Sequence, residues 1–154
     1  MPSHTVASHT IRIPAPVDPC RRFFTPAGEE LWVEGWQPTY LHPSDGRTQA
    51  GMVFTTGSGP AFTIWSLVDH DPVAHRVRYV RVTPASRSGF VEVRCRSAGA
   101  QATDVEVGYA LTALTPAGAA ELEAFQGPAF VDMIEGWRRA IEARLPQLLA
   151  ADIR

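Results

Sequence analysis

The sequence predicts an α+β protein in which a curved antiparallel sheet of six or seven strands packs on one long C-terminal helix. Between residues 51 and 114, five strand-like segments are separated by turns, and the last two alternate apolar and polar residues, which is the period of strands with one buried face. Between residues 130 and 145, apolar residues instead recur every three or four positions, as on one face of a helix. A sheet with one apolar face and a helix with one apolar stripe bury these surfaces against each other.

The first part of the chain predicts one strand followed by two short helices. Residues 9–13 alternate as a half-buried strand does, and prolines follow them. Asp18 and the proline after it suit the start of a helix in which two phenylalanines face inward. Thr25 and Pro26 end this helix and can start another helical turn through residues 29–31.

The segment 30–46 carries Trp32, Trp36, Tyr40 and His42 between prolines, which disfavour both helices and central strands. It predicts an irregular stretch with one weak strand. We expect Trp32 to anchor the core, and the other three side chains to lie at the rim of a binding site.

The middle of the chain predicts five further strands, separated by turns rich in Gly, Pro, Asp and Ser. We expect them at residues 51–56, 61–69, 75–83, 90–96 and 102–114. In the last two, apolar residues occupy every second position and mostly polar residues fall between them. One face of the sheet is therefore expected to be apolar and the other to face water.

The last part of the chain predicts a long helix from Thr115 to about Leu145. We expect a kink at Gly127-Pro128, because the proline has no backbone N–H to donate. Pro146 is expected to end the helix. Its apolar face is formed by Phe130, Met133, Ile134, Trp137, Ile141 and Leu145.

The length and composition bound the class of protein. A chain of 154 residues suits one domain, 1–154, with 1–7 as a flexible N-terminus and 147–154 as a C-terminal tail. The first ten residues lack the pattern of a signal peptide, and no apolar run reaches about 18 residues, so we expect a cytoplasmic location without a membrane span. Cys20 and Cys95 stand far apart in the sequence and are expected to be buried free thiols.

Composition also excludes several function classes. All 14 basic residues are arginines and the net charge is −2, so we expect no binding to nucleic acid. Without any lysine, the protein cannot form a Schiff base with a substrate or with pyridoxal phosphate. No glycine-rich dinucleotide or phosphate loop is present, and we expect no cofactor.

Five segments carry a resemblance to a known superfamily: "FTPAGEELWVEGWQPTYLHP", "GMVFTT", "RYVRVTP", "GYALTAL" and "FVDMIEGWRRAI". Their order resembles the START-like or SRPBCC superfamily, which has the helix-grip fold. It includes bacterial polyketide cyclases, carriers of aromatic ligands and activators of the heat-shock protein 90 ATPase. The resemblance covers nearly the whole chain and implies a cavity for a hydrophobic ligand, such as a lipid or an aromatic compound, between sheet and helix. The superfamily shares no single catalytic motif, so no catalytic residue is carried over.

Aromatic side chains are expected to surround this cavity. The candidate ligand-binding residues are Trp36, Tyr40, Phe54, Trp65, Tyr79, Arg81, Tyr109, Phe130, Met133 and Trp137. The alternative is that these side chains fill the interior completely. The resemblance favours a cavity, since buried Tyr and Trp have a polar tip that needs a partner. We expect a volume of about 300 Å³ or more.

Arg81 is expected to face the interior. If Val77 and Tyr79 point inward, strict alternation places Arg81 inside with them. The opposite register would bury two arginines at positions 76 and 78, and we favour the first because it buries one charge instead of two. The partner of Arg81 is left open between an anionic group of a ligand and a carboxylate of the protein, Glu92 or Glu106.

No catalytic residue is assigned, and the weak candidates are His42, Arg81 and Tyr79. A metal site is not expected in the segment "DHDPVAH", residues 69–75, because it lies on a hairpin turn. The favoured function is therefore binding of a hydrophobic, ring-containing small molecule. The alternatives are an enzyme resembling a polyketide cyclase or dehydratase, and an interaction module resembling the chaperone activators, whose protein partner the sequence does not support.

Overall fold

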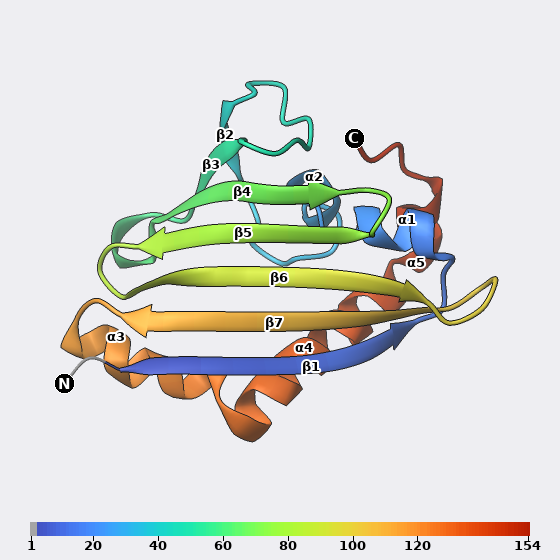
Figure 1. Ribbon diagram of the computed structural model, residues 1–154. Helices are drawn as coiled ribbons and strands as arrows, with labels where there is room; N and C mark the ends of the chain where they lie inside the picture. Colours follow the sequence, from blue (N-terminus) through green and yellow to red (C-terminus); the bar gives the residue numbers. More distant parts are fainter. Residues whose placement is uncertain (1–2) are drawn as a thin grey trace.

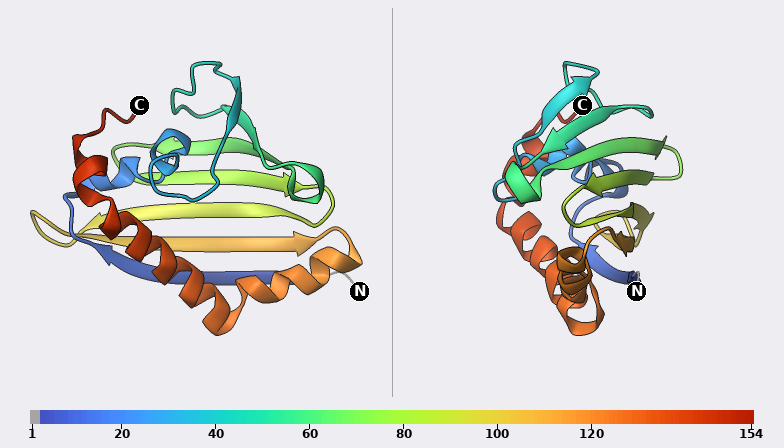
Figure 2. Two further views of the ribbon diagram at one scale, coloured as in Figure 1. Left: turned by 180° about the vertical axis from the view of Figure 1, so that it is seen from behind. Right: turned by 90° about the vertical axis from the view of Figure 1, so that its left-hand side faces the viewer.

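The computed structural model describes residues 3–154 and contains one seven-stranded antiparallel sheet with helices on a single face (Figures 1 and 2). The strands are β1 (His4–Ile13), β2 (Thr39–His42), β3 (Val53–Thr56), β4 (Thr63–Asp71), β5 (Arg76–Thr83), β6 (Arg87–Ser97) and β7 (Thr103–Ala113). Their order across the sheet is β1-β7-β6-β5-β4-β3-β2. This arrangement confirms the α+β class and the strand number that the sequence predicts.

The helices are α1 (Val17–Arg22), α2 (Pro26–Glu29), α3 (Pro116–Glu121), α4 (Gly127–Ala143) and α5 (Leu145–Ala150). Two 3₁₀ turns, η1 (Gly59–Ala61) and η2 (Leu122–Phe125), complete the elements. Figure 2 shows α4 running diagonally across the sheet, with α1 and α2 beside it near β4 and β5. The other face of the sheet, which faces the viewer in Figure 1, carries no helix.

The alternation expected in the strands is confirmed by burial. Every second residue faces the helices and is buried along β5, from Val91 to Cys95 in β6 and from Thr103 to Leu111 in β7, and the residues between them are exposed or half-buried. In β5 this buried set is Val77, Tyr79, Arg81 and Thr83, so the favoured register is the observed one. Arg76 and Arg78 lie on the opposite face of the sheet, where water reaches them.

The two short helices pack closely on the sheet. Thr25 caps α2, because its hydroxyl accepts a hydrogen bond from the backbone N–H of Gly28 at 3.1 Å. A Cβ atom at Gly28 would lie 2.1 Å from the carbonyl oxygen of Arg22, so the close approach of α1 and α2 requires glycine here. Trp32 is buried and donates its indole N–H to the carbonyl of Phe23 at 2.8 Å, which confirms it as a core anchor.

The C-terminal helix is broken where the sequence predicts only a kink. Helix α3 ends at Glu121, and after η2 the chain is extended at Gln126. Gly127 then adopts a φ of +52°, a left-handed conformation that residues with a side chain rarely adopt. Pro128 follows in the first turn of α4. The glycine and proline therefore begin a new helix instead of bending an existing one.

Both chain ends differ from expectation. Strand β1 already begins at His4, so residues 4–7 of the expected flexible N-terminus are ordered in the sheet, and residues 1–2 lie outside the described part. At the other end, Pro146 does not end the helical region but lies in the first turn of α5. Leu148 and Ile153 are buried in the core, so the expected tail is instead packed on the protein.

Candidate functional site

A cavity of about 170 Å³ lies between the sheet and α4, beside α2; we call it the inner cavity. Its walls come from α2 and the segment after it, from strands β4, β5, β6 and β7, and from α4. The lining residues are Glu29, Val33, Trp36, Trp65, Tyr79, Arg81, Val91, Val93, Tyr109 and Trp137. It is smaller than the volume that the sequence led us to expect, because α4 packs closely on the sheet through three fully buried side chains, Phe130, Ile134 and Ile141.

Two tryptophans form an apolar wall of the inner cavity. Trp65 lies between Phe54, on which it stacks with ring centroids 5.7 Å apart, and Trp36, which it meets edge-on at 5.5 Å. Their polar tips are bonded to the protein: the indole N–H of Trp36 donates to the carbonyl of Pro26, and that of Trp65 to the hydroxyl of Thr56. Only the carbon faces of these rings are therefore left to contact a ligand.

Arg81 is the charged group of the inner cavity, and its side chain is only partly satisfied. The residue is 8% exposed, its Cζ lies 4.8 Å from the ring centroid of Trp65, and its Nη2 donates to Thr83 at 2.8 Å. Its Nε is buried without a hydrogen-bond partner. Burial lowers the pKa of the Arg81 guanidinium to about 10, and the nearby positive charge of Arg87 is the second cause of this shift.

No carboxylate neutralises Arg81 within residues 3–154. None of the ion pairs found there includes Arg81, and Glu92, one of the two partners considered from the sequence, pairs with Arg94 instead. Glu92 and Glu106 occupy the strand positions that alternate with the buried ones, on the face away from the helices. The pairing of Arg81 with Glu92 or Glu106 is thus wrong, and its pairing with a ligand group stays a prediction.

Glu29, at the end of α2, is a second ionisable group of the inner cavity that the sequence did not single out. Its carboxyl group accepts no hydrogen bond from the part of the chain that the structure describes. The side chain is half-buried by surface area, and it lines the cavity. Enclosure by the protein raises the pKa of the Glu29 carboxyl well above its usual range.

The raised pKa of Glu29 predicts a pH effect on stability. Between the unfolded-state pKa of about 4.5 and the higher folded-state pKa, the folded protein holds a proton that the unfolded chain has lost. Glu29 therefore destabilises the fold progressively as the pH rises through this window. We expect Glu29→Gln to be more stable than the wild type at neutral pH, with a difference that shrinks toward pH 4. Urea unfolding between pH 4 and 8 measures it.

The exposed Glu34→Gln provides the matched control, because it removes the same charge outside the inner cavity. A constant difference between Glu29→Gln and the wild type across this range would contradict the assigned environment of Glu29.

Two tyrosines in the inner cavity differ in their hydrogen bonds. The hydroxyl of Tyr79 donates to the carbonyl of Phe24 at 2.7 Å, and burial raises its pKa well above the usual value. Tyr79, a weak catalytic candidate, thus uses its proton to hold α1 on the sheet. Tyr109 makes no hydrogen bond within residues 3–154, and burial raises its pKa to about 12. Its hydroxyl is therefore free to donate to a ligand.

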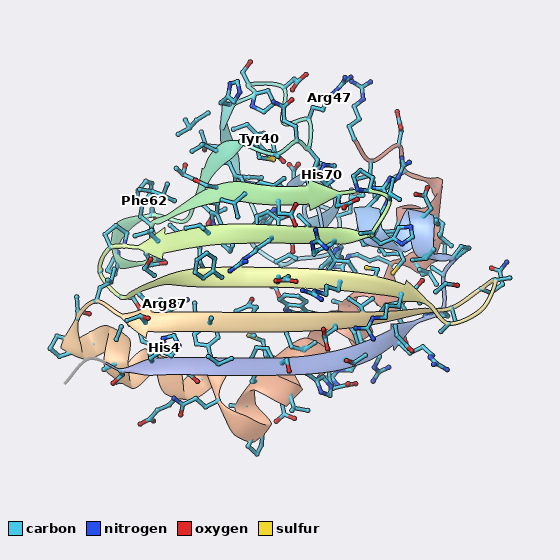
Figure 3. All side chains as sticks on the ribbon, viewed as in Figure 1. His4, Tyr40, Arg47, Phe62, His70 and Arg87 are labelled. Carbon is cyan, nitrogen blue, oxygen red and sulfur yellow. The ribbon has the colours of Figure 1, made fainter. Side chains whose placement is uncertain are left out.

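Four candidate ligand-binding residues do not line the inner cavity. Phe54 and Phe130 are buried behind it, under Trp65 and Tyr109. Met133 on α4 is half-buried and packs against the core. Tyr40 lies at the upper edge of the sheet, where its ring covers Gly46 and its hydroxyl donates to Glu30 at 2.7 Å (Figure 3).

The remaining polar candidates lie outside the inner cavity. His42 is exposed on the edge strand β2, so it does not reach a ligand in the inner cavity. At the end of β4, Asp69 and Asp71 both lie within 4.0 Å of the guanidinium of Arg76, the first residue of β5. Both carboxylates therefore form ion pairs with Arg76 of the same hairpin.

Glu29, Val33, Val91 and Val93 line the inner cavity without having been predicted as site residues. Val91 and Val93 are inward members of the alternation of β6, which also describes fully packed core residues, whereas Val33 lies in the irregular segment after α2. The sequence offers only a weak indication of Glu29. The capped turn "TPAGEEL" contains two adjacent glutamates, and the local pattern does not show which of them points inward.

The chain has a helix-grip α+β fold, and several solved structures share this arrangement. It matches norcoclaurine synthase from Thalictrum flavum with a TM-score of 0.67 and 10% identity, over 95% of this chain and 88% of that one. It matches the Zhui aromatase/cyclase from Streptomyces sp. R1128 with a TM-score of 0.58 and 17% identity, over 98% and 90%. A protein from Thermobifida fusca matches with a TM-score of 0.61 and 17% identity, over 80% and 83%.

These identities establish the fold alone. No family profile matches the sequence, and no curated protein matches it. Within residues 3–154, no helix is both long enough and apolar enough to cross a membrane.

Proposed function

We propose that this protein binds a small molecule with one aromatic ring and a hydrogen-bond acceptor, with the ring in the inner cavity and the acceptor on Arg81. The observation that carries this proposal is a buried guanidinium with an unpartnered Nε at the wall of an aromatic cavity. Buried donors without partners cost free energy, and a ligand acceptor offsets that cost. Two proteins of similar fold, a synthase solved with dopamine and hydroxybenzaldehyde and an aromatase/cyclase, support a small-molecule ligand in general.

The volume of the inner cavity favours a single ring. An apolar cavity of about 150 Å³ holds one benzene molecule, whereas pockets for drug-sized ligands span about 300 to 1,000 Å³. At about 170 Å³, the inner cavity suits one substituted ring better than a lipid chain or a fused-ring system. A cytoplasmic location belongs to the same proposal and rests on the two free, buried cysteines, since secreted proteins usually pair theirs.

Filling the inner cavity tests this proposal. Val33→Phe places a ring in the space intended for the ligand, and the half-buried position after α2 tolerates a larger side chain. We expect acetophenone to quench the tryptophan fluorescence of the wild type in a saturable manner, and Val33→Phe to weaken this binding about tenfold or more. Val68→Phe, at a position 49% exposed in β4, is the control and should bind normally. Equal binding by Val33→Phe and the wild type would contradict the site.

A second candidate function, catalysis of proton transfer, is favoured by Glu29. This carboxyl group and Arg81 line the same cavity, so a base and a cation can act on one ligand. As carboxylate, Glu29 would take a proton from the carbon beside a carbonyl, while Arg81 donates to the enolate oxygen. Returning the proton to carbon completes the cycle without any oxidant. The chaperone-activator alternative stays a prediction.

The exchange of hydrogen for deuterium tests the catalytic candidate without knowledge of the substrate. In D₂O, the wild type should accelerate the loss of the methyl proton signal of acetophenone in NMR spectra, and Glu29→Gln should not. Absence of acceleration by the wild type, with binding intact, leaves binding as the function and rejects catalysis of this kind.

A further inference from the structure

A second pocket, of about 240 Å³, lies at the end of the sheet where β5 ends and β6 begins; we call it the lateral pocket. It lies between η1 and the start of the C-terminal helices, and Figure 3 shows the labelled Arg87 at this end. The lining residues are Pro60, Ala61, Thr63, Arg81, Thr83, Arg87 and Glu121. Arg81 lines both pockets, so the lateral pocket and the inner cavity meet at this residue.

The lateral pocket contains two arginines and one carboxylate. Arg87 donates to Glu121 at 3.2 Å and to the hydroxyl of Ser86, while Arg81 has no acidic partner. The Nε atoms of both arginines are buried and have no hydrogen-bond partner in the described part of the chain. Thr63 and Thr83 are hydrogen-bonded to each other at 2.6 Å, and Thr83 also accepts from Arg81. The pocket thus carries one uncompensated positive charge and two unused N–H donors.

We propose that the lateral pocket is an anion subsite, and that the natural ligand joins the ring in the inner cavity to a short arm ending in an oxyanion. This inference rests on the proposed function, because it extends the ligand of the inner cavity past Arg81. Carboxylate and phosphate share the chemistry that two guanidinium groups recognise. Together the two pockets exceed the lower limit of about 300 Å³ for ligand pockets.

Burial makes an anion the favourable occupant. A guanidinium that is 8% exposed has lost most of its hydration, and a neutral acceptor restores only part of that loss. An oxyanion between Arg81 and Arg87 supplies both hydrogen bonds and the missing negative charge. Glu121 competes for Arg87, and its side chain is 52% exposed, so it can turn into solvent when a ligand arrives.

Three probes that each carry a phenyl ring on a two-carbon arm test the subsite: 3-phenylpropanoate, 2-phenylethyl phosphate and the neutral 3-phenylpropanamide. Titration followed by tryptophan fluorescence measures the affinity of each for the intact protein. We expect at least one anionic probe to bind about tenfold or more tighter than the amide, as charge-assisted hydrogen bonds require. The preferred anion identifies the arm as carboxylate or phosphate.

Variants then show which residues cause the preference for an anionic probe over the amide. Arg87→Gln should reduce the preference for the anion over the amide to less than about threefold. Glu121→Gln should strengthen anion binding because the competing carboxylate is gone. Arg96→Gln is the control, since it removes the same charge from an exposed position at the far end of β6. Thermal unfolding verifies that each variant is folded.

The outcomes separate the two proposals. If the amide binds as tightly as both anions, the anion subsite is wrong and ring binding stands. The subsite is also wrong if Arg87→Gln weakens all three probes alike, or if Arg96→Gln removes the preference equally well. If none of the probes binds, both proposals fail.

Discussion

Replacing Arg81 with methionine is expected to make the protein more stable and at the same time to abolish most of its ligand binding. Methionine fills a similar volume and keeps a favourable sulfur–aromatic contact with Trp65, but it has no charge to bury. Removing a buried cation without a carboxylate partner should raise the free energy of unfolding by about 1 to 3 kcal/mol. Affinity for 3-phenylpropanoate should fall about 100-fold, because its charge-assisted hydrogen bonds are lost.

Urea unfolding and fluorescence titration of the same preparation measure both effects. Arg96→Met controls for the charge, and we expect it to change neither quantity appreciably, because Arg96 is exposed on the opposite face. A variant at Arg81 that is markedly less stable would show that this arginine serves the fold and not a ligand.

Replacing Phe54 with alanine is expected to cause the largest loss of stability, about 3 to 5 kcal/mol. Its ring is fully buried, stacks on Trp65 at 5.7 Å, and meets the rings of Trp36 and Tyr79 edge-on at 5.9 and 6.3 Å. Loss of this ring leaves a void behind the wall of the inner cavity that the closely packed neighbours cannot fill. Chemical unfolding measures the change.

Phe62→Ala is the matched control, because Phe62 is 38% exposed in the connection before β4 and its removal leaves no closed void. We expect it to cost less than about 1 kcal/mol. Equal losses from the two substitutions would show that Phe54 does not act through the cavity wall.

Much of the fold could be predicted from local patterns. Alternation identified the inward side chains of β5, β6 and β7, and the helical spacing identified Phe130, Ile134 and Ile141 as the buried face of α4. These predictions succeed because burial of one face imposes a fixed period on strand and helix. The sequence predicts the position of the interruption at Gly127 correctly but its form wrongly. A proline after a glycine is compatible both with a kink and with the start of a new helix, and the structure has the second.

The candidate site was predictable only in part. Six of the ten proposed ligand-binding residues line the inner cavity, namely Trp36, Trp65, Tyr79, Arg81, Tyr109 and Trp137. The other four are packed behind or beside it. Periodicity identifies the side chains that point inward. Whether such a side chain lines a cavity or packs against another side chain depends on how closely the sheet and the helix approach each other, and no local sequence pattern determines that distance.

The sequence by itself determined the α+β class, the alternating faces of the strands and the interior position of Arg81, because each follows from the spacing of apolar and charged residues along one element. Only the tertiary structure decided the size of the inner cavity, the position of Glu29 in its wall and the presence of Arg81 and Arg87 in one pocket. These features join residues of different elements, or of opposite ends of two strands. The distances between these residues depend on the register and twist of the sheet and on how α4 packs against it.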